Sequence, residues 1–270
     1  MSSFNRSPLL LDVGGTFVKC EDGRQVPIHS DGTVQEISAA LRAAAGPAPA
    51  DGVGVAIPGP FDYREGIFRM THKFAAVNGM PFRELAGIPD EVPLRMMHDV
   101  NAALLGAHVL SGQQGNAALV TMGTGLGFAY SIDGRPQCND AGSPARSLYN
   151  LPYADGILED AVSARGIRNA YRDRTRQDIG SAHLIAQRAY AGDVDAQEVF
   201  SDLGRTLGEF LPPLLEKLGT ETLWFGGQIS KSFSLLERPL RNALADALPG
   251  LSVSPLPAGA VFAGLKTLFI

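Results

Sequence analysis

The sequence predicts an α/β fold made of two related lobes, each of which begins with a β-hairpin. Short apolar runs end in glycine and polar residues, and segments with apolar residues at helical spacing separate them. Residues 116–134 repeat the pattern of residues 9–20: an apolar strand, a turn of glycine and threonine, and an apolar return strand. The length of 270 residues is enough for two such lobes.

The first lobe is predicted to span residues 1–112. Gly14 and Gly15 form a tight turn between two strands, and Gly46 ends an amphipathic helix. Asp99 favours the first position of a helix. The predicted elements are a hairpin at 9–20, a helix at 34–45, a strand at 52–58, loops with short helical pieces at 63–93, a strand at 94–98 and a helix at 99–110.

The second lobe is predicted to span residues 113–258, and a C-terminal helix at 259–270 is expected to pack back on the first lobe. Pro212 and Pro213 should kink or divide the longest helix. The predicted elements are a hairpin at 116–134, loops at 135–156, helices at 157–171, 181–191, 195–218 and 233–248, and strands at 222–225 and 251–256.

The composition is that of a globular protein, with 45% hydrophobic and 19% charged residues. The formal net charge of −5 argues against nucleic acid as a partner, because nucleic-acid-binding proteins depend on contacts between basic side chains and phosphates. No apolar run reaches the roughly 18 residues that span a bilayer. Residues 1–8 lack the apolar core of a signal peptide, so we expect a cytoplasmic protein without a membrane partner. Cys20 and Cys138 are the only cysteines, which excludes a cysteine-rich zinc site.

The turn at Gly14 and Gly15 has the composition of an anion site. Glycine lets backbone N–H groups approach an anion closely, and Thr16 adds a hydroxyl donor. Asp12, at the end of the strand, has the chemistry to hold a hydrated magnesium ion. The stretch taken alone is equally consistent with an ordinary hairpin in which the aspartate caps the turn.

Four polar or glycine-rich segments each follow an apolar strand. In an α/β fold, ligands bind at the carboxyl ends of the strands. Four such segments in one chain therefore indicate one ligand site rather than four unrelated turns. The segments are 12–16, 98–101, 122–127 and 225–230.

These motifs resemble those of the ROK family of bacterial sugar kinases, in the actin-like ATPase superfamily. Residues 12–19 match the family's first phosphate motif, 123–127 the second, and 226–230 the segment near the adenosine. Residues 54–60 match its sugar-site loop, and Asp99 matches its catalytic aspartate. The resemblance covers nearly the whole chain, and it implies a two-lobed, ribonuclease H-like fold with the active-site cleft between the lobes.

The resemblance also implies ATP and Mg²⁺ as cofactors, a sugar as substrate, and a homodimer. Asp99 is then the general base, and Asp12 positions magnesium through water or phosphate. The cofactor-binding residues are Asp12, Gly14, Gly15, Thr16, Lys19, Gly123, Thr124, Gly125, Gly226 and Gly227. The substrate-binding residues are Gly59, Pro60, Lys73, His98, Asp99 and Glu159.

The sequence departs from the family pattern in the zinc segment and at two positions of the sugar site, Lys73 and His98. The family's histidine and three-cysteine zinc segment is absent from residues 138–148, so we expect no zinc site. Glu159 lies in a segment similar to the family's glycine-cysteine-leucine-glutamate, which implies a ligand for a sugar hydroxyl. The alternative interpretation is that Glu159 is an ordinary surface glutamate on a helix. Lys73 and His98 stand where the family uses amides, which suits hydroxyls or an anionic group. The alternative interpretation is that Lys73 is solvated and that His98 is a strand-end residue with satisfied hydrogen bonds.

The leading hypothesis is ATP-dependent phosphorylation of a hydroxyl on a hexose or a modified sugar. A second class is the sugar-responsive repressor, but only eleven residues precede Asp12, too few for a helix-turn-helix domain. A third class is a non-catalytic sugar-binding or scaffold protein of the same fold. The presence of Asp12, Thr16, Asp99 and Thr124 argues against that third class.

Overall fold

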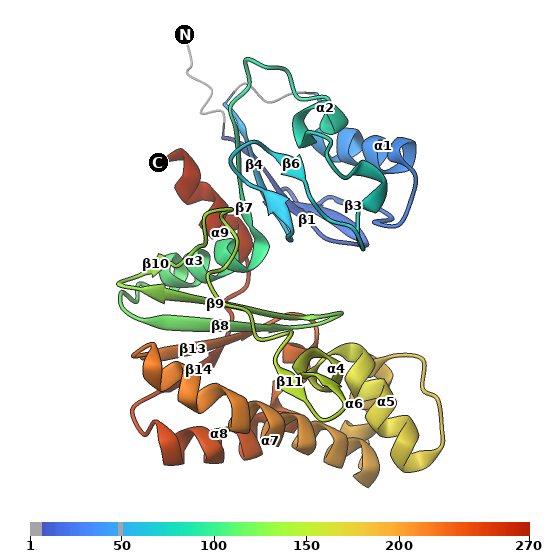
Figure 1. Ribbon diagram of the computed structural model, residues 1–270, viewed down its shortest axis with the longest axis vertical. Helices are drawn as coiled ribbons and strands as arrows, with labels where there is room; N and C mark the ends of the chain where they lie inside the picture. The colour runs from blue at the N-terminus through green and yellow to red at the C-terminus, as the bar shows by residue number, and fades with distance from the viewer. Residues whose placement is uncertain (1–6, 48–50) are drawn as a thin grey trace. The chain divides into compact units, whose positions relative to one another are not determined.

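The computed structural model describes residues 7–47 and 51–270, which divide into two compact units. The first unit contains the described residues up to Gln113 together with Pro136–Ala145 and Pro257–Ile270. The second contains Gln114–Arg135 and Arg146–Leu256. Residues 1–6, on which the expected absence of a signal peptide partly rests, lie outside the described residues. Each unit has a five-stranded sheet (Figure 1).

The sheet of the first unit has the strand order β3-β2-β1-β4-β7. Strands β1 and β2 form an antiparallel hairpin, whereas β1, β4 and β7 run parallel. The carboxyl ends of these three parallel strands therefore meet at one edge of the sheet. The strands are β1 (Leu9–Val13), β2 (Phe17–Cys20), β3 (Gln25–Pro27), β4 (Val53–Ile57) and β7 (Leu94–His98).

Helices cover this sheet, and two of them are in backbone contact. A Cβ added to Gly106 would lie 1.7 Å from the Ala260 carbonyl oxygen, and one added to Gly264 would lie 2.0 Å from that of Ala102. Only glycine allows this approach between α3 and α9. The elements are α1 (Val34–Ala45), β5 (Phe61–Asp62), β6 (Ile67–Phe68), η1 (Ala75–Val77), α2 (Phe82–Ala86), α3 (Asp99–Ser111), α9 (Ala260–Lys266) and η3 (Thr267–Phe269).

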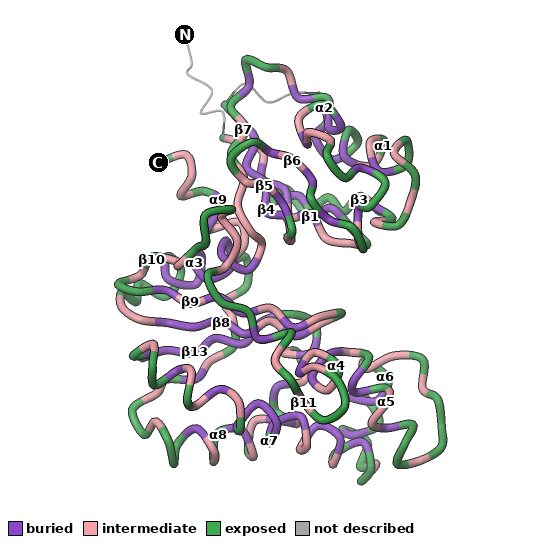
Figure 2. The backbone as a smooth tube through the Cα atoms, viewed as in Figure 1, coloured by how far each residue is buried: buried purple, intermediate pink, exposed green. Residues whose placement is uncertain are grey.

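The sheet of the second unit repeats the same plan in the order β10-β9-β8-β13-β14. Strands β8 and β9 form an antiparallel hairpin, and β13 and β14 continue the sheet parallel to β8. Figure 2 shows buried residues along β8 and β13. The strands are β8 (Ala117–Met122), β9 (Leu126–Ile132), β10 (Arg135–Pro136), β13 (Thr222–Gly226) and β14 (Ser252–Pro255), with a separate pair, β11 (Pro152–Tyr153) and β12 (Gly156–Ile157).

The helices of the second unit differ from the prediction in two places. The single helix predicted at 157–171 is two helices, because the Ser163 side chain accepts the Gly166 N–H and starts a new helix there. Pro212 and Pro213 do not divide α7, which buries leucines on both sides of them. The helices are α4 (Leu158–Val162), α5 (Ala164–Thr175), α6 (Ala182–Tyr190), α7 (Val194–Lys217), η2 (Ile229–Ser232) and α8 (Phe233–Ala247). None of the helices in the described ranges is long and apolar enough to cross a membrane.

Candidate functional site

The turn between β1 and β2 is held open by backbone hydrogen bonds at its base. The Gly14 N–H donates to the Phe17 carbonyl at 2.9 Å, and the carbonyls of Gly15 and Thr16 accept from Ser30 and Ile28. Within the described ranges, the N–H groups of Gly15 and Thr16 donate to no protein acceptor. Two free N–H groups beside an exposed threonine hydroxyl are what an anion site requires.

Asp12 and Lys19 face each other across the β1–β2 hairpin. The Lys19 Nζ lies 3.2 Å from the Asp12 Oδ2, and the aspartate side chain is only 18% exposed. Burial raises the pKa of Asp12, and the opposing effect of Lys19 does not cancel that increase. A buried carboxylate whose ionised form is disfavoured gains from a further cation, so its oxygens fit a magnesium ion.

Asp99 begins α3 directly after β7, at the carboxyl edge of the same sheet. Its Oδ1 accepts the Val100 N–H at 2.8 Å and lies 2.9 Å from the His98 Nδ1. Burial alone would raise the pKa of Asp99, but the His98 hydrogen bond and charge, the Val100 N–H and the charge of Lys73 together lower it. The carboxylate is therefore ionised at neutral pH, with its side chain 34% exposed.

The loop after β4 lies beside His98. A Cβ added to Gly59 would lie 3.5 Å from the His98 Cδ2, and Pro60 follows as an exposed residue. Lys73 is half-buried and acts on Asp99 through its charge. The first unit thus brings Asp12, the Gly59 loop, Lys73, His98 and Asp99 to one edge of its sheet.

Two further residues belong to this edge: Tyr63, which the sequence did not single out, and Asn101, which lies in the predicted segment 98–101 but was given no role. The Tyr63 hydroxyl donates to the Ile57 carbonyl at 2.9 Å, and its ring centroid lies 5.8 Å from that of His98. Burial and the charge of Asp99 raise the pKa of Tyr63, so its hydroxyl stays neutral. Asn101 is buried and donates to the Cys138 Sγ at 3.2 Å. A polar residue within an apolar helix was the available signal for Asn101.

In the second unit, the β8–β9 turn and the end of β13 are in contact. The Gly123 N–H donates to the Gly125 carbonyl at 3.0 Å, and no acceptor in the described chain takes the N–H of Thr124 or Gly125. Gly227 has φ +86°, and a Cβ there would lie 2.2 Å from the Met122 carbonyl oxygen. The end of β8 and the segment at Gly226 and Gly227 therefore lie side by side, so closely that only glycine fits at position 227.

Glu159 lies against the same turn of the second unit. Its Oε2 accepts the Leu126 N–H at 2.9 Å, and a Cβ on Gly125 would lie 2.6 Å from that oxygen. The sequence indicated a sugar ligand at Glu159 but gave no sign of this contact. One carboxylate oxygen of Glu159 is therefore used to hold the start of β9.

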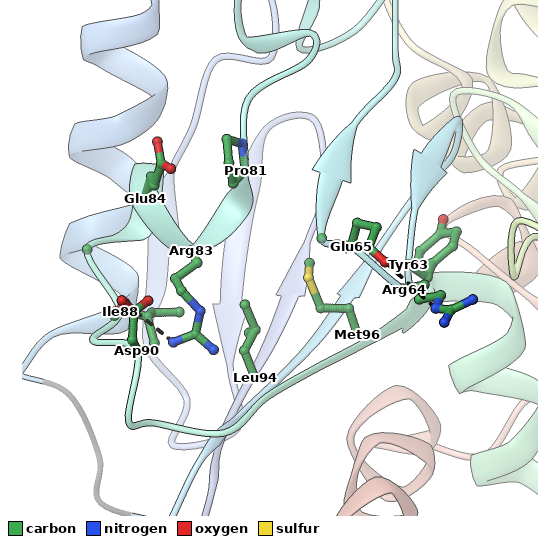
Figure 3. A pocket seen from close by; sticks show the side chains of 12 residues that line it. Tyr63, Arg64, Glu65, Pro81, Arg83, Glu84, Ile88, Asp90, Leu94 and Met96 are labelled. Carbon is green, nitrogen blue, oxygen red and sulfur yellow. Dashed lines mark hydrogen bonds and ion pairs between the residues drawn. The ribbon is translucent and has the colours of Figure 1, made fainter.

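A separate hollow of about 400 Å³ lies beside β7 in the first unit (Figure 3). Leu94 and Met96 form its apolar side, and charged residues such as Glu84 and Asp90 surround them. The Arg83 guanidinium is occupied, because it donates to carbonyls that include that of Val92 at 3.0 Å. None of the predicted site residues lines this hollow.

The two hairpin-led sheets, each continued by parallel strands and covered by helices, are the mark of an actin-like, two-lobed α/β fold. The family model described as "ROK family" matches residues 10–145, and the chain belongs to that family. Among solved structures, the ROK family glucokinase from Streptomyces griseus in complex with glucose and AMPPNP is similar, with a TM-score of 0.76. It is 20% identical, and the match covers 97% of this chain and 98% of that one.

Two curated relatives differ in what they do. The N-acetylmannosamine kinase of Escherichia coli O1:K1 is 23% identical over 242 residues, which cover 82% of each chain. The DNA-binding transcriptional repressor Mlc of Escherichia coli K12 is 22% identical over 224 residues, which cover 74% of this chain and 54% of the repressor. The relatives of this chain therefore include both a kinase and a repressor.

Proposed function

We propose that the protein transfers the γ-phosphoryl group of ATP to a hydroxyl of a hexose or a modified sugar. Membership of the ROK family and similarity to proteins named as sugar kinases support the reaction class. The observation that carries the proposal is the state and position of Asp99. Asp99 is an ionised carboxylate at the carboxyl edge of the sheet that also carries Asp12 and the β1–β2 turn.

Asp99 would act as the general base. The sugar hydroxyl oxygen attacks the γ-phosphorus while its proton passes to the carboxylate, the bond from phosphorus to the β,γ-bridging oxygen breaks, and ADP leaves. The proton then returns from Asp99 to solvent. A lowered pKa keeps Asp99 deprotonated between turnovers, so that each cycle starts from the base form.

The phosphates of ATP would be held by the two glycine turns. In the first unit, the N–H groups of Gly15 and Thr16 and the ammonium of Lys19 are suited to phosphate oxygens, with Gly14 shaping the turn. Asp12 would hold magnesium through water or phosphate, and the ion supplies charge neutralisation on the phosphates. In the second unit the corresponding residues are Gly123, Thr124 and Gly125, with Gly226 and Gly227 beside the nucleotide and Gly227 packed against the Met122 backbone.

The sugar would bind beside Asp99. Gly59 and Pro60 offer a loop with little side-chain bulk, and Lys73 offers donors near the reacting hydroxyl. We also propose Glu159 as a sugar ligand through the oxygen that the Leu126 N–H does not occupy. As its sequence predicts, the purified protein should carry no stoichiometric zinc, and elemental analysis tests this.

The test is ADP release, coupled to a dehydrogenase, across a panel of neutral, N-acetylated and acidic sugars. At least one sugar should stimulate ADP release by wild-type protein, and Asp99→Asn should abolish that stimulation while ATP binding persists in calorimetry. If no sugar stimulates turnover although ATP and a sugar bind, the protein is a non-catalytic member of the fold. Equal rates for wild type and Asp99→Asn would reject Asp99 as the base.

A further inference from the structure

One ring nitrogen of His98 contacts the carboxylate of its neighbour Asp99. His98 is the last residue of β7 and occupies the N-cap position of α3. Its Nδ1 lies 2.9 Å from the Asp99 Oδ1, and the Val100 nitrogen lies 3.2 Å from the same Nδ1 and 2.8 Å from Oδ1. The three atoms form a compact group at the helix N-terminus.

The position of one proton follows from these distances. A bare imidazole nitrogen and a carboxylate oxygen 2.9 Å apart would repel each other through their lone pairs. Because Asp99 is ionised, the proton between them is on the Nδ1 of His98. The Val100 N–H then donates to the nearer acceptor, which is Oδ1 at 2.8 Å.

This arrangement treats the two oxygens of Asp99 differently. Oδ1 accepts both the His98 Nδ1–H and the Val100 N–H. No donor among the described residues contacts Oδ2. The side chain is 34% exposed, so Oδ2 remains accessible to a substrate hydroxyl.

The imidazole ring is itself held in place. The His98 side chain is only 15% exposed, with the Tyr63 ring on one side, and a Cβ added to Gly59 would lie 3.5 Å from its Cδ2. Besides His98, the charged groups that act on Asp99 or respond to it are Lys73 and Asp12, and Tyr63 is neutral. Of these groups, only His98 is in hydrogen-bond contact with the carboxylate.

We propose that His98 is a positioning residue, whose Nδ1–H fixes Asp99 so that Oδ2 takes the proton of the sugar hydroxyl. The proposal rests on the proposed kinase function, and it assigns the Nδ1 of His98 to the base instead of to the sugar. A hydrogen bond that orients the base acts on the reaction step and has little effect on sugar affinity.

Three variants distinguish the roles of the two ring nitrogens of His98. In His98→Asn the amide nitrogen takes the position of Nδ1, whereas in His98→Gln it reaches the position of Nε2. His98→Leu keeps the branching of the side chain and removes both nitrogens. We expect His98→Gln and His98→Leu to lower kcat about 10- to 100-fold with the sugar KM within about threefold. His98→Asn should recover most of the lost kcat.

The opposite pattern would overturn the proposal. If His98→Gln keeps the wild-type kcat and His98→Asn raises the sugar KM, the Nε2 of His98 binds the sugar and Asp99 needs no positioning. Circular dichroism checks the fold of each variant, and the Asn and Gln variants decide the matter even if the Leu variant fails to fold. In active variants without the donor, the acid limb of kcat should move to higher pH, because the hydrogen bond that lowers the pKa of Asp99 is lost.

A readout without turnover keeps the two proposals apart. Side-chain ¹⁵N NMR of the free protein should show a protonated, hydrogen-bonded Nδ1 at His98, and this signature should change in Asp99→Asn. An unprotonated Nδ1 in the wild type would overturn the positioning role even if the protein is a kinase. Absence of sugar-stimulated turnover with the NMR signature intact would instead reject the kinase function and leave the hydrogen bond as a structural contact at the start of α3.

Discussion

The β1–β2 turn of the first unit and the β8–β9 turn of the second have the same local plan and different surroundings. Both follow a buried strand, both close on a glycine N–H, and both leave two backbone N–H groups without an acceptor in the described part of the chain. In the first unit, the charges beside the turn come from its own strands, as the Asp12–Lys19 pair. In the second, the charge comes from Glu159 on α4.

This difference distinguishes contacts that the hairpin itself fixes from contacts that depend on the packing of other elements. A strand pair brings opposite residues together by register, so Asp12 and Lys19 must meet wherever this hairpin forms. The contact of Glu159 with Leu126 depends instead on how α4 packs. Similarly, Gly227 reaches the second turn from β13, whereas a Cβ on Gly15 would meet nothing closer than the Ser30 Oγ at 3.3 Å. The first turn takes its charged residues from its own two strands, whereas the second takes its charge from α4 and its close packing from the end of β13.

The largest effect on activity is expected from Asp12→Asn. Removing the charge that would hold magnesium should lower kcat/KM by about 100- to 1,000-fold in the coupled assay. Asp22→Asn is the matched control, since Asp22 lies in the turn between β2 and β3, with its side chain 50% exposed. A loss of less than about threefold in Asp12→Asn, or an equal loss in the control, would show that this turn does not hold the metal.

Gly227→Ala should have the largest effect on stability. Its Cβ would lie 2.2 Å from the Met122 carbonyl oxygen at φ +86°, so we expect a loss of about 3 kcal/mol in urea unfolding. Gly15→Ala places its Cβ 3.3 Å from a movable hydroxyl and should cost about 1 kcal/mol or less. Equal losses in the two variants would contradict the distinction between the loosely packed Gly15 and the tightly packed Gly227.

Glu159→Ala tests the charge that the second turn receives from α4. Loss of one hydrogen bond to a charged acceptor, worth about 1.5 kcal/mol, should raise the KM for ATP about tenfold, and loss of the proposed sugar contact should raise the KM for the sugar as well. Glu159→Gln keeps an oxygen acceptor for the Leu126 N–H and should stay closer to wild type. A rise confined to the KM for the sugar would assign Glu159 to the sugar alone.

The smallest effect is a pH-dependent change in stability at Asp12. Because burial raises its pKa above the unfolded value, ionised Asp12 opposes folding at neutral pH, and this cost disappears as pH falls through the folded pKa. In metal-free buffer, Asp12→Asn should therefore be at least as stable as wild type at pH 7. The gain in Tm should vanish near pH 4, and a variant less stable than wild type at pH 7 would contradict this sign.

Local patterns in the sequence located most of the first unit. The strands β1, β2 and β7 and the helix α1 have the predicted bounds. Short apolar runs, glycine turns and helix-capping residues mark these bounds, and each of these signals involves only a few neighbouring residues. The short strands β5 and β6 and the strand β3 were not predicted, since their pairing depends on partners and turns that no short apolar run marks.

The sites divide in the same way. The Asp12–Lys19 pair and Asp99 at the start of α3 follow from sequence neighbours and register. The contacts of Glu159 with Leu126 and of Tyr63 with His98 join residues 33 and 35 positions apart, and no local pattern predicts them. The continuity of α7 through Pro212 and Pro213 likewise depends on the core that its leucines enter.

The most direct test of the kinase proposal is detection of the phosphorylated sugar itself. Wild-type protein, ATP, Mg²⁺ and the stimulating sugar should yield one sugar phosphate for each ADP, measured by mass spectrometry and by coupled assay. Asp99→Asn should form product at least about 100 times more slowly while binding ATP with unchanged affinity in calorimetry. ADP release without sugar phosphate, or wild-type rates in Asp99→Asn, would contradict the account.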